Sequence, residues 1–258
     1  MMWTTLPRSE REGLAYVEAG CGKPLLFLHG VGLKAEAWNA QVEVFKHTNR
    51  VFAPDMPGHG ESERLGGKTS LEDYTKKLSI LIDEPATIVG HSMGAMIALD
   101  MAICFPEYVK GIIAVNPVFR RSDDAARAVQ ARAAEITTNF PPDPSNPLNR
   151  WFGNNECDEK EACRDWLTHV NPGGYKDAYM VFATEDGPCE GELKSIACPS
   201  LFITGANDPN STPAMSEAMA NLAQKGTSMI VDAAAHMLPM THAKELNKSI
   251  LEFLPNCV

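Results

Sequence analysis

The chain has 258 residues, which is enough for one large domain or two small ones. Hydrophobic residues make up 44% of it and charged residues 22%, as in ordinary globular proteins. These fractions exclude a disordered chain, a collagen-like repeat and a small protein held together by disulfides. The 23 Lys and Arg against 33 Asp and Glu give a net charge of −10. Because such a chain repels phosphate backbones and no basic patch is visible in the sequence, we expect no nucleic-acid partner.

The most apolar stretch, residues 86–105, is nearly long enough to span a bilayer. It contains His91, Ser92 and Asp100, and two glycines interrupt it. We therefore interpret it as a buried strand, a turn and a helix, and we expect no membrane insertion.

The first residues lack a basic segment followed by an apolar core, so no signal peptide is expected. Seven scattered cysteines without a CxxC pair favour a reducing, cytoplasmic location. A disulfide from Cys157 to Cys163 or Cys189 stays open at this point.

The first half of the chain alternates short apolar runs with longer amphipathic ones. Strands are expected at residues 14–18, 25–28, 51–54, 87–89 and 111–115. Helices are expected at residues 36–46, 71–82 and 93–104. This alternation predicts an α/β fold with a mostly parallel central sheet and helices on both faces.

The alternation stops after Asn116. The next segment has helical patterns at residues 123–136 and 157–169, a proline-rich break at 140–147 and a turn at 171–174. The alternation then returns with strands at residues 201–204 and 229–231 and helices at 213–224 and 243–253. We therefore predict an α/β core of residues 1–118 and 188–258, with a helical cap or lid inserted at 119–187. Insertions of this length are usually functional.

The central motif is Gly-His-Ser-Met-Gly at residues 90–94, which matches G-x-S-x-G. A serine on a sharp turn between a strand and a helix is lifted clear of the sheet, and its neighbours must be tiny for the chain to double back. The helix that follows directs backbone N–H groups at the reacting centre. This context makes Ser92 a candidate nucleophile.

A nucleophilic serine needs a base, and the base needs an acid that orients it. Asp208 follows the expected strand at 201–204, and His236 follows the one at 229–231. Loops after parallel strands emerge at the same edge of the sheet, so both can reach Ser92. We expect His236 to be the general base and Asp208 the orienting acid. Three other carboxylates remain alternatives for the acid: Asp123, Asp124 and Asp186.

The oxyanion that forms during acyl transfer needs hydrogen-bond donors. We expect the backbone N–H of Met93, directly after the nucleophile, and that of Val31, in the glycine-rich loop after the strand at 25–28. Four residues of the insertion are candidates for substrate binding: Arg120, Arg121, Trp151 and Trp166. The arginines could clamp a carboxylate or form a solvated pair, and the tryptophans could line an acyl pocket or form a small core of the insertion.

With these motifs in place, the chain resembles the α/β-hydrolase superfamily. The resemblance lies in segments at residues 28–32, 55–62, 90–94, 205–209 and 235–238, in the order the superfamily requires. The pattern is similar to small carboxylesterases and 3-oxoadipate enol-lactonases. Dehalogenases and epoxide hydrolases of the superfamily carry an aspartate where this chain has Ser92. Carbon–carbon bond hydrolases often carry Asn and Gly where this chain has His91 and Ala95.

These observations predict a cofactor-free serine hydrolase that cleaves a small carboxylic ester or lactone through an acyl-enzyme. The spacing of His29, His59 and His91 matches no metal-binding motif, so no metal is expected. One alternative is hydrolysis of a carbon–carbon bond, or perhydrolysis, by the same three residues. Another is a non-catalytic small-molecule binding module on a hydrolase fold. The sequence carries no signal for the oligomeric state.

Overall fold

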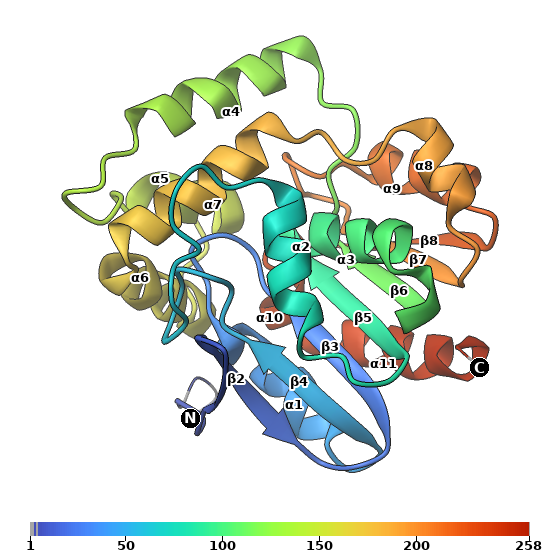
Figure 1. Ribbon diagram of the computed structural model, residues 1–258. Helices are drawn as coiled ribbons and strands as arrows, with labels where there is room; N and C mark the ends of the chain where they lie inside the picture. The colour runs from blue at the N-terminus through green and yellow to red at the C-terminus, as the bar shows by residue number, and fades with distance from the viewer. Residues whose placement is uncertain (1–2, 4, 258) are drawn as a thin grey trace.

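The computed structural model describes Trp3 and residues 5–257. This part of the chain contains one eight-stranded sheet with the order β1-β2-β4-β3-β5-β6-β7-β8 (Figure 1). The pairs β1–β2 and β2–β4 are antiparallel, and the remaining pairs are parallel, which confirms the predicted fold class. The strands are β1 (Ser9–Arg11), β2 (Leu14–Ala19), β3 (Lys23–Leu28), β4 (Asn49–Pro54), β5 (Ala86–His91), β6 (Val109–Val115), β7 (Ser200–Gly205) and β8 (Gly226–Val231).

Side chains alternate between the two faces of the sheet and feed two separate cores. One core packs Leu26, Ile88 and Ile112 against helices on one side. The other packs Phe27 and Val89 against helices on the opposite side. The inner strands therefore read as nearly continuous apolar runs, as expected where both faces are covered.

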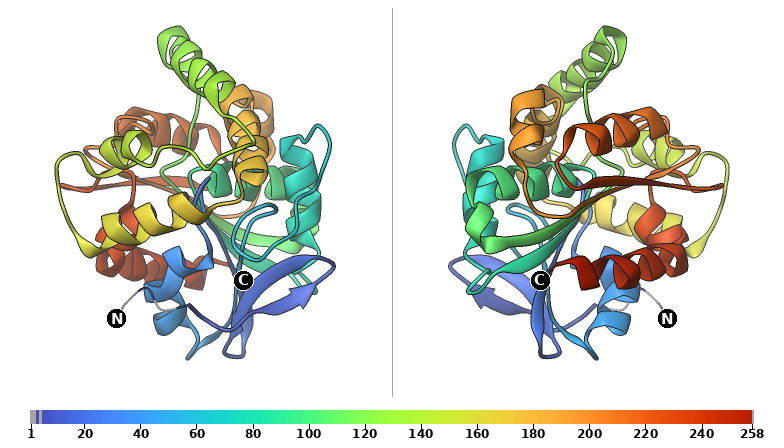
Figure 2. Two further views of the ribbon diagram at one scale, coloured as in Figure 1. Left: turned by 90° about the vertical axis from the view of Figure 1, so that its left-hand side faces the viewer. Right: turned by 90° about the vertical axis from the view of Figure 1, so that its right-hand side faces the viewer.

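Two groups of helices cover these faces (Figures 1 and 2). The first core is covered by α2 (Leu71–Ser79), α3 (Met93–Cys104), α8 (Glu190–Ser195) and α9 (Pro213–Leu222). The second is covered by η1 (Ala35–Trp38), α1 (Asn39–Phe45), α10 (Leu238–Thr241) and α11 (Ala243–Phe253). Two further short 3-10 turns follow α3 and α11, namely η2 (Pro106–Tyr108) and η3 (Leu254–Asn256).

Between β6 and β7 the chain forms a separate group of helices. These are α4 (Asp123–Glu135), α5 (Ser145–Phe152), α6 (Asp158–His169) and α7 (Pro172–Thr184). In Figure 1 the arrowhead of β5 points toward this group, and α4 forms its outer edge. All of these helices fall within the predicted insertion at residues 119–187, and we call them the cap. The division of the chain into core and cap domains remains a prediction.

Two cap helices begin where the sequence indicated a break and a turn. Helix α5 begins at Ser145, inside the proline-rich stretch, and tolerates Pro147 because N–H groups in a first turn have no helical acceptor. The expected turn at residues 171–174 is the start of α7. There the Asn171 side chain accepts the Gly174 N–H at 2.9 Å, and Pro172 occupies the first helical position.

The cap contacts the core through the loop after β4. A Cβ atom on Gly58 would lie 2.6 Å from the Cα of Gly174, so the two backbones touch at a distance that only glycine allows. Beside them, Arg64 Nη2 lies 2.7 Å from Asp177 Oδ2. The beginning of α7 is thereby held against the core.

A buried ion cluster holds the start of the same loop. Arg8 Nη2 lies 2.7 Å from Glu36 Oε2, and its Nε lies 3.0 Å from Asp55 Oδ2. Both carboxylates are fully buried. Asp55 also accepts the Ala35 N–H at 2.8 Å and the Glu61 N–H at 3.0 Å. The end of β4 is therefore tied to η1 and to the N-terminal segment.

Within the described residues, no helix combines the length and hydrophobicity that a membrane span needs. The seven cysteines are all free thiols. The disulfide that the sequence left open for Cys157 is therefore not formed.

The ion cluster yields a stability prediction. Arg8→Leu leaves the buried Asp55 without a cation and Glu36 with only Lys34, whose Nζ lies 3.8 Å from Glu36 Oε2. The loss should lower the free energy of unfolding by about 3–5 kcal/mol, measured by urea denaturation at pH 7. The matched control is Arg127→Leu, which removes an exposed pair with Asp124 and should cost less than about 1 kcal/mol. Equal losses in the two variants would contradict the role of burial.

Candidate active site

Ser92 occupies the strained turn that the sequence motif predicted, between β5 and α3. Its φ of 55° and ψ of −116° lie in a region that side chains rarely adopt. A Cβ on Gly90 would collide with the carbonyl of Gly94, and one on Gly94 with the carbonyl of Leu28. The turn therefore requires glycine at both positions, and it presses the start of α3 against the end of β3.

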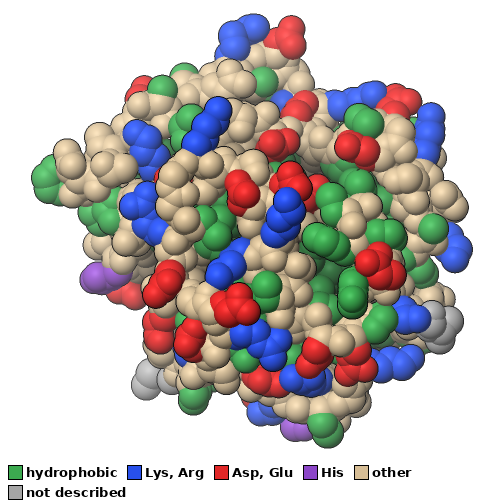
Figure 3. Space-filling model, viewed as in Figure 1, with side chains coloured by type: hydrophobic (Ala, Val, Ile, Leu, Met, Phe, Trp, Pro, Cys, Tyr) green, Lys and Arg blue, Asp and Glu red, His purple; other side chains and the backbone are tan. Residues whose placement is uncertain are grey.

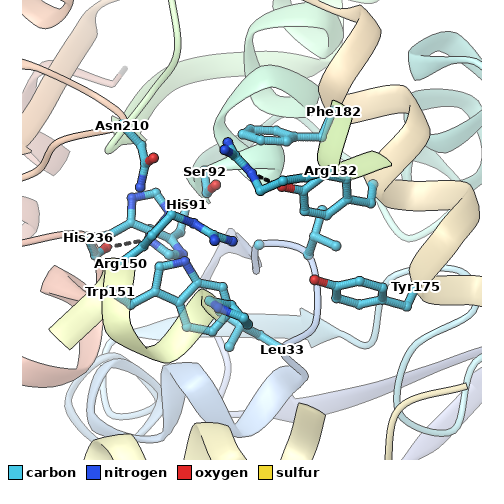
Figure 4. Close-up of a pocket in the computed structure, with 14 residues that line it drawn as sticks. Leu33, His91, Ser92, Arg132, Arg150, Trp151, Tyr175, Phe182, Asn210 and His236 are labelled. Carbon is cyan, nitrogen blue, oxygen red and sulfur yellow. Dashed lines mark hydrogen bonds between the residues drawn. The ribbon is translucent and has the colours of Figure 1, made fainter. Parts of the chain in front are cut away.

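The structure brings Asp208 and His236 together at the same edge of the sheet. Asp208 follows β7 and His236 follows β8, and Asp208 Oδ2 lies 2.7 Å from His236 Nδ1. This bond leaves Nε2 of His236 available for a proton. His236 and Ser92 line one pocket, where the Trp151 ring stacks on the imidazole with centroids 6.2 Å apart (Figure 4).

Four hydrogen bonds hold the Asp208 carboxylate. Oδ1 accepts the backbone N–H groups of Asn210 at 2.8 Å and Ser211 at 3.2 Å, and Oδ2 accepts the side-chain amide of Asn116 at 2.7 Å as well as His236. Burial alone would raise the pKa of Asp208, but the charge and hydrogen bond of His236 and the two N–H groups outweigh it, so the pKa lies below its usual value. Sequence reasoning missed Asn116, although its place directly after β6 puts it at this edge.

The loop after β3 lies directly against the turn that carries Ser92. A Cβ on Gly30 would be 3.1 Å from that of Ser92. Val31 lines the pocket, and Met93 begins α3. Within the described residues neither backbone N–H has a protein acceptor, which leaves both free to meet an oxyanion. Their role as oxyanion donors stays a proposal.

Three buried histidines fix the loops around the site. His29 donates from Nδ1 to the Gly30 carbonyl and accepts the Met56 N–H at Nε2, while His59 Nε2 accepts the Gly32 N–H at 3.0 Å. His91 Nε2 donates to the carbonyl of His236 at 2.8 Å. The described residues contain no group of three or more His, Cys, Asp or Glu that could hold a metal ion.

Burial keeps these three imidazoles neutral. Desolvation lowers the pKa of His29 to about 3, that of His59 to about 4 and that of His91 to about 3. Neighbouring histidines lower the pKa of His29 and His91 further. The three residues therefore act as neutral hydrogen-bonding groups.

The pocket is enclosed by the core and the cap together, with a volume of about 40 Å³. Its lining includes the turn that carries Ser92, the loop after β3 and three cap helices. The lining residues are Gly30, Val31, Leu33, His91, Ser92, Arg132, Pro147, Arg150, Trp151, Tyr175, Tyr179, Phe182, Asn210 and His236. Of the four cap residues considered from the sequence, only Trp151 is in this lining.

The other three lie elsewhere. Arg120 is exposed and ion-paired with Glu190 at 2.7 Å. The Arg121 guanidinium donates to the carbonyl of Phe182, and the Arg121 backbone N–H donates to the carboxylate of Asp186. Asp186 therefore holds the start of the insertion. Trp166, on cap helix α6, is buried and packs edge-to-face on Trp3, with centroids 6.1 Å apart.

The arginines that do line the pocket, Arg132 and Arg150, were not expected from the sequence. They lie on α4 and α5 at positions that approach each other only when the cap folds. The remaining alternatives for the acid, Asp123 and Asp124, are exposed in the first turn of α4. Asp208 is the carboxylate hydrogen-bonded to His236.

Comparison with known proteins agrees with this architecture. Residues 25–249 match the alpha/beta hydrolase family, and the chain belongs to that family. It is 36% identical to an (E)-2-((N-methylformamido)methylene)succinate hydrolase of Acinetobacter baylyi, over 98% of both chains. It is 25% identical to 3-oxoadipate enol-lactonase 2 of the same organism, over 88% of this chain and 86% of that one. A solved esterase from Thermogutta terrifontis, with malate bound, has a TM-score of 0.85 and 25% identity, over 95% of this chain and 94% of that one.

The buried neutral histidines predict a pH dependence of stability. In the unfolded chain a histidine has a pKa of about 6.5, so between about pH 6.5 and 5 the unfolded state binds more protons than the folded state. The free energy of unfolding should therefore fall as the pH falls through this window, by up to about 1.4 kcal/mol per pH unit for each histidine. Urea denaturation at pH 7, 6 and 5 measures this slope.

His59→Gln removes one such histidine and keeps a hydrogen-bond donor and an acceptor at this position. The slope of the free energy of unfolding against pH should therefore decrease by the contribution of about one proton. His47→Gln, at an exposed position, is the control and should leave the slope unchanged. A His59→Gln variant with the slope of the parent protein would contradict the burial account.

Proposed function

We propose that this protein is a serine hydrolase that cleaves a small carboxylic ester or lactone through an acyl-enzyme on Ser92. The observation that carries the proposal is the 2.7 Å bond between Asp208 and His236 in the pocket that Ser92 also lines. The enol-lactonase and the esterase among its relatives support an ester or lactone as substrate.

The proposed reaction begins when His236 Nε2 takes the proton of the Ser92 hydroxyl, while the oxygen attacks the substrate carbonyl. Asp208 holds the tautomer and stabilises the imidazolium that forms. The backbone N–H groups of Val31 and Met93 bind the oxyanion. The tetrahedral intermediate collapses, the leaving oxygen takes the proton from His236, and an ester to Ser92 remains. Water, deprotonated by His236, attacks this ester, and the acid product leaves with Ser92 restored.

The relatives also indicate the polarity of the substrate. The Acinetobacter baylyi hydrolase is named for a succinate, the lactonase for 3-oxoadipate, and the esterase was solved with malate. Each of these is a small dicarboxylate or derives from one.

A second candidate is favoured by the relative that is 36% identical. Its name describes a formamide of a methylenesuccinate, which contains no ester or lactone. The same three residues would then cleave a carbon–nitrogen or carbon–carbon bond. Mass spectrometry of the products separates the candidates by the bond that breaks. The substrates are a lactone, a vinylogous diketone and an N-formyl enamine. Acetate with peroxide tests for perhydrolysis.

Ser92→Ala tests the nucleophile. Turnover of p-nitrophenyl butyrate should fall by roughly 10⁴- to 10⁶-fold, as when the serine is removed from serine proteases, because no oxygen remains to form the acyl-enzyme. Circular dichroism checks that the variant is folded. A folded variant with full activity would remove Ser92 from the reaction, whereas a parent protein without turnover would favour the binding-module alternative.

Asp208→Asn tests the acid. The histidine loses its orienting carboxylate, and kcat should fall by up to roughly 10⁴-fold. Asp186→Asn is the matched control, because that carboxylate holds a cap loop, and its kcat should stay near that of the parent. The acid is misassigned if the two variants respond in the opposite way.

A further inference from the structure

Two guanidinium groups from different cap helices face the pocket. Arg132 comes from α4 and Arg150 from α5, and both line the space that Ser92 and His236 border. Figure 4 shows their charged ends and the Tyr175 hydroxyl directed into this space. Arg132 Nε lies 3.2 Å from the Tyr179 hydroxyl, which orients its guanidinium.

These two arginines differ from the other arginines of the chain. Most of the others are ion-paired with carboxylates: Arg8, Arg50, Arg64, Arg120, Arg121, Arg127 and Arg164. Across the described residues, neither Arg132 nor Arg150 has a carboxylate partner. Burial lowers the pKa of Arg150, and the charge of Arg132 lowers it further, as expected for two cations in need of an anion.

The pocket itself has a charge that contrasts with the rest of the protein. Its lining contains both arginines and neither Asp nor Glu, and the buried His91 is neutral. The chain as a whole carries −10. On the face shown in Figure 3, acidic and basic side chains are interspersed. The excess of positive charge beside Ser92 is therefore local.

The arginine pair also borders a second, larger groove on the cap. This groove, of about 310 Å³, shares part of its lining with the pocket, and it is also lined by the carboxylates Glu135 and Asp143. The shared residues are Arg132, Pro147, Arg150, Tyr175 and Tyr179. The two guanidinium groups therefore border both the groove and the space beside Ser92.

We propose that Arg132 and Arg150 bind the carboxylate groups of the substrate, so that the enzyme selects small dianionic acyl compounds over neutral and monoanionic ones. This rests on the proposed function, because the bound carboxylates present the remaining carbonyl of the substrate to Ser92. Guanidinium forks match the planar carboxylate with two parallel hydrogen bonds. Two unpaired cations are balanced by two negative charges, so succinate is a suitable probe.

Binding to the Ser92→Ala protein tests the inference without turnover. Isothermal titration should give tighter binding for succinate than for butyrate or inorganic phosphate. In the same background, Arg150→Gln and Arg132→Gln should each weaken succinate binding by roughly ten- to a hundredfold, the usual loss for a charge-assisted hydrogen bond. Arg120→Gln, at an arginine already paired with Glu190 outside the pocket, is the matched control and should bind succinate as the parent does.

Steady-state kinetics provide a second measurement, first on the unmodified enzyme and then on Arg150 variants. The ratio of kcat/KM for the p-nitrophenyl monoester of tricarballylate, which keeps two carboxylates, to that for p-nitrophenyl hemisuccinate, which keeps one, should exceed one, and succinate should inhibit competitively. Arg150→Gln should lower this ratio at least roughly tenfold, and Arg150→Lys, which keeps the charge without the fork, should restore part of it.

The inference is overturned if succinate binds no more tightly than butyrate, if phosphate binds equally well, or if the arginine variants bind succinate like the control. These failures differ from a failure of the proposed function. In that case Ser92→Ala retains hydrolysis, whatever the arginines bind.

Discussion

The site depends on the close approach of the turn after β5 to the end of β3. Gly94 lies against the carbonyl of Leu28, and Gly30 lies against the side chain of Ser92. A side chain at Gly94 would separate the two segments, and one at Gly30 would crowd the side chain of Ser92. This contact places Ser92, the N-terminus of α3 and the N–H groups of the β3 loop within one small volume. The Asp208–His236 pair is added from the neighbouring strands β7 and β8.

The environment of the site combines neutral histidines with a few fixed charges. His29, His59 and His91 are buried and hydrogen-bonded to the backbone of the surrounding loops, and their lowered pKa values keep them neutral. Of the three, His91 lines the pocket. The negative charge of Asp208 is satisfied by four hydrogen bonds. The positive charges of Arg132 and Arg150 are supplied by the cap. The core thus provides the proposed reaction centre, and the cap the proposed selection of substrate.

The sequence predicted the fold and the three central side chains because their signals are local. A glycine pair around Ser92 and the positions of Asp208 and His236 after apolar strands identify a single edge of a parallel sheet. Helix α7 was missed because Asn-Pro-Gly-Gly is also the signature of a turn, and only the cap from Asn171 distinguishes the two.

The cap arginines could not be selected from the sequence for a different reason. Arg120 and Arg121 follow β6 closely, but each forms an ion pair with a carboxylate that is distant in the sequence, Arg120 with Glu190 and Arg121 with Asp186. Arg132 and Arg150 meet only through the packing of α4, α5 and α7, which hydrophobic periodicity does not specify. Asn116 likewise acquires its partner only when β6 and β7 pair.

The central claim is that Ser92 is the activated nucleophile of this pocket. The most direct measurement is peptide mapping by mass spectrometry after treatment with a fluorophosphonate. The account predicts one covalent adduct, on the peptide that contains Ser92, formed much more slowly when Asp208 is replaced by Asn. An adduct on another residue, or continued ester hydrolysis by protein that carries the Ser92 adduct, would contradict it.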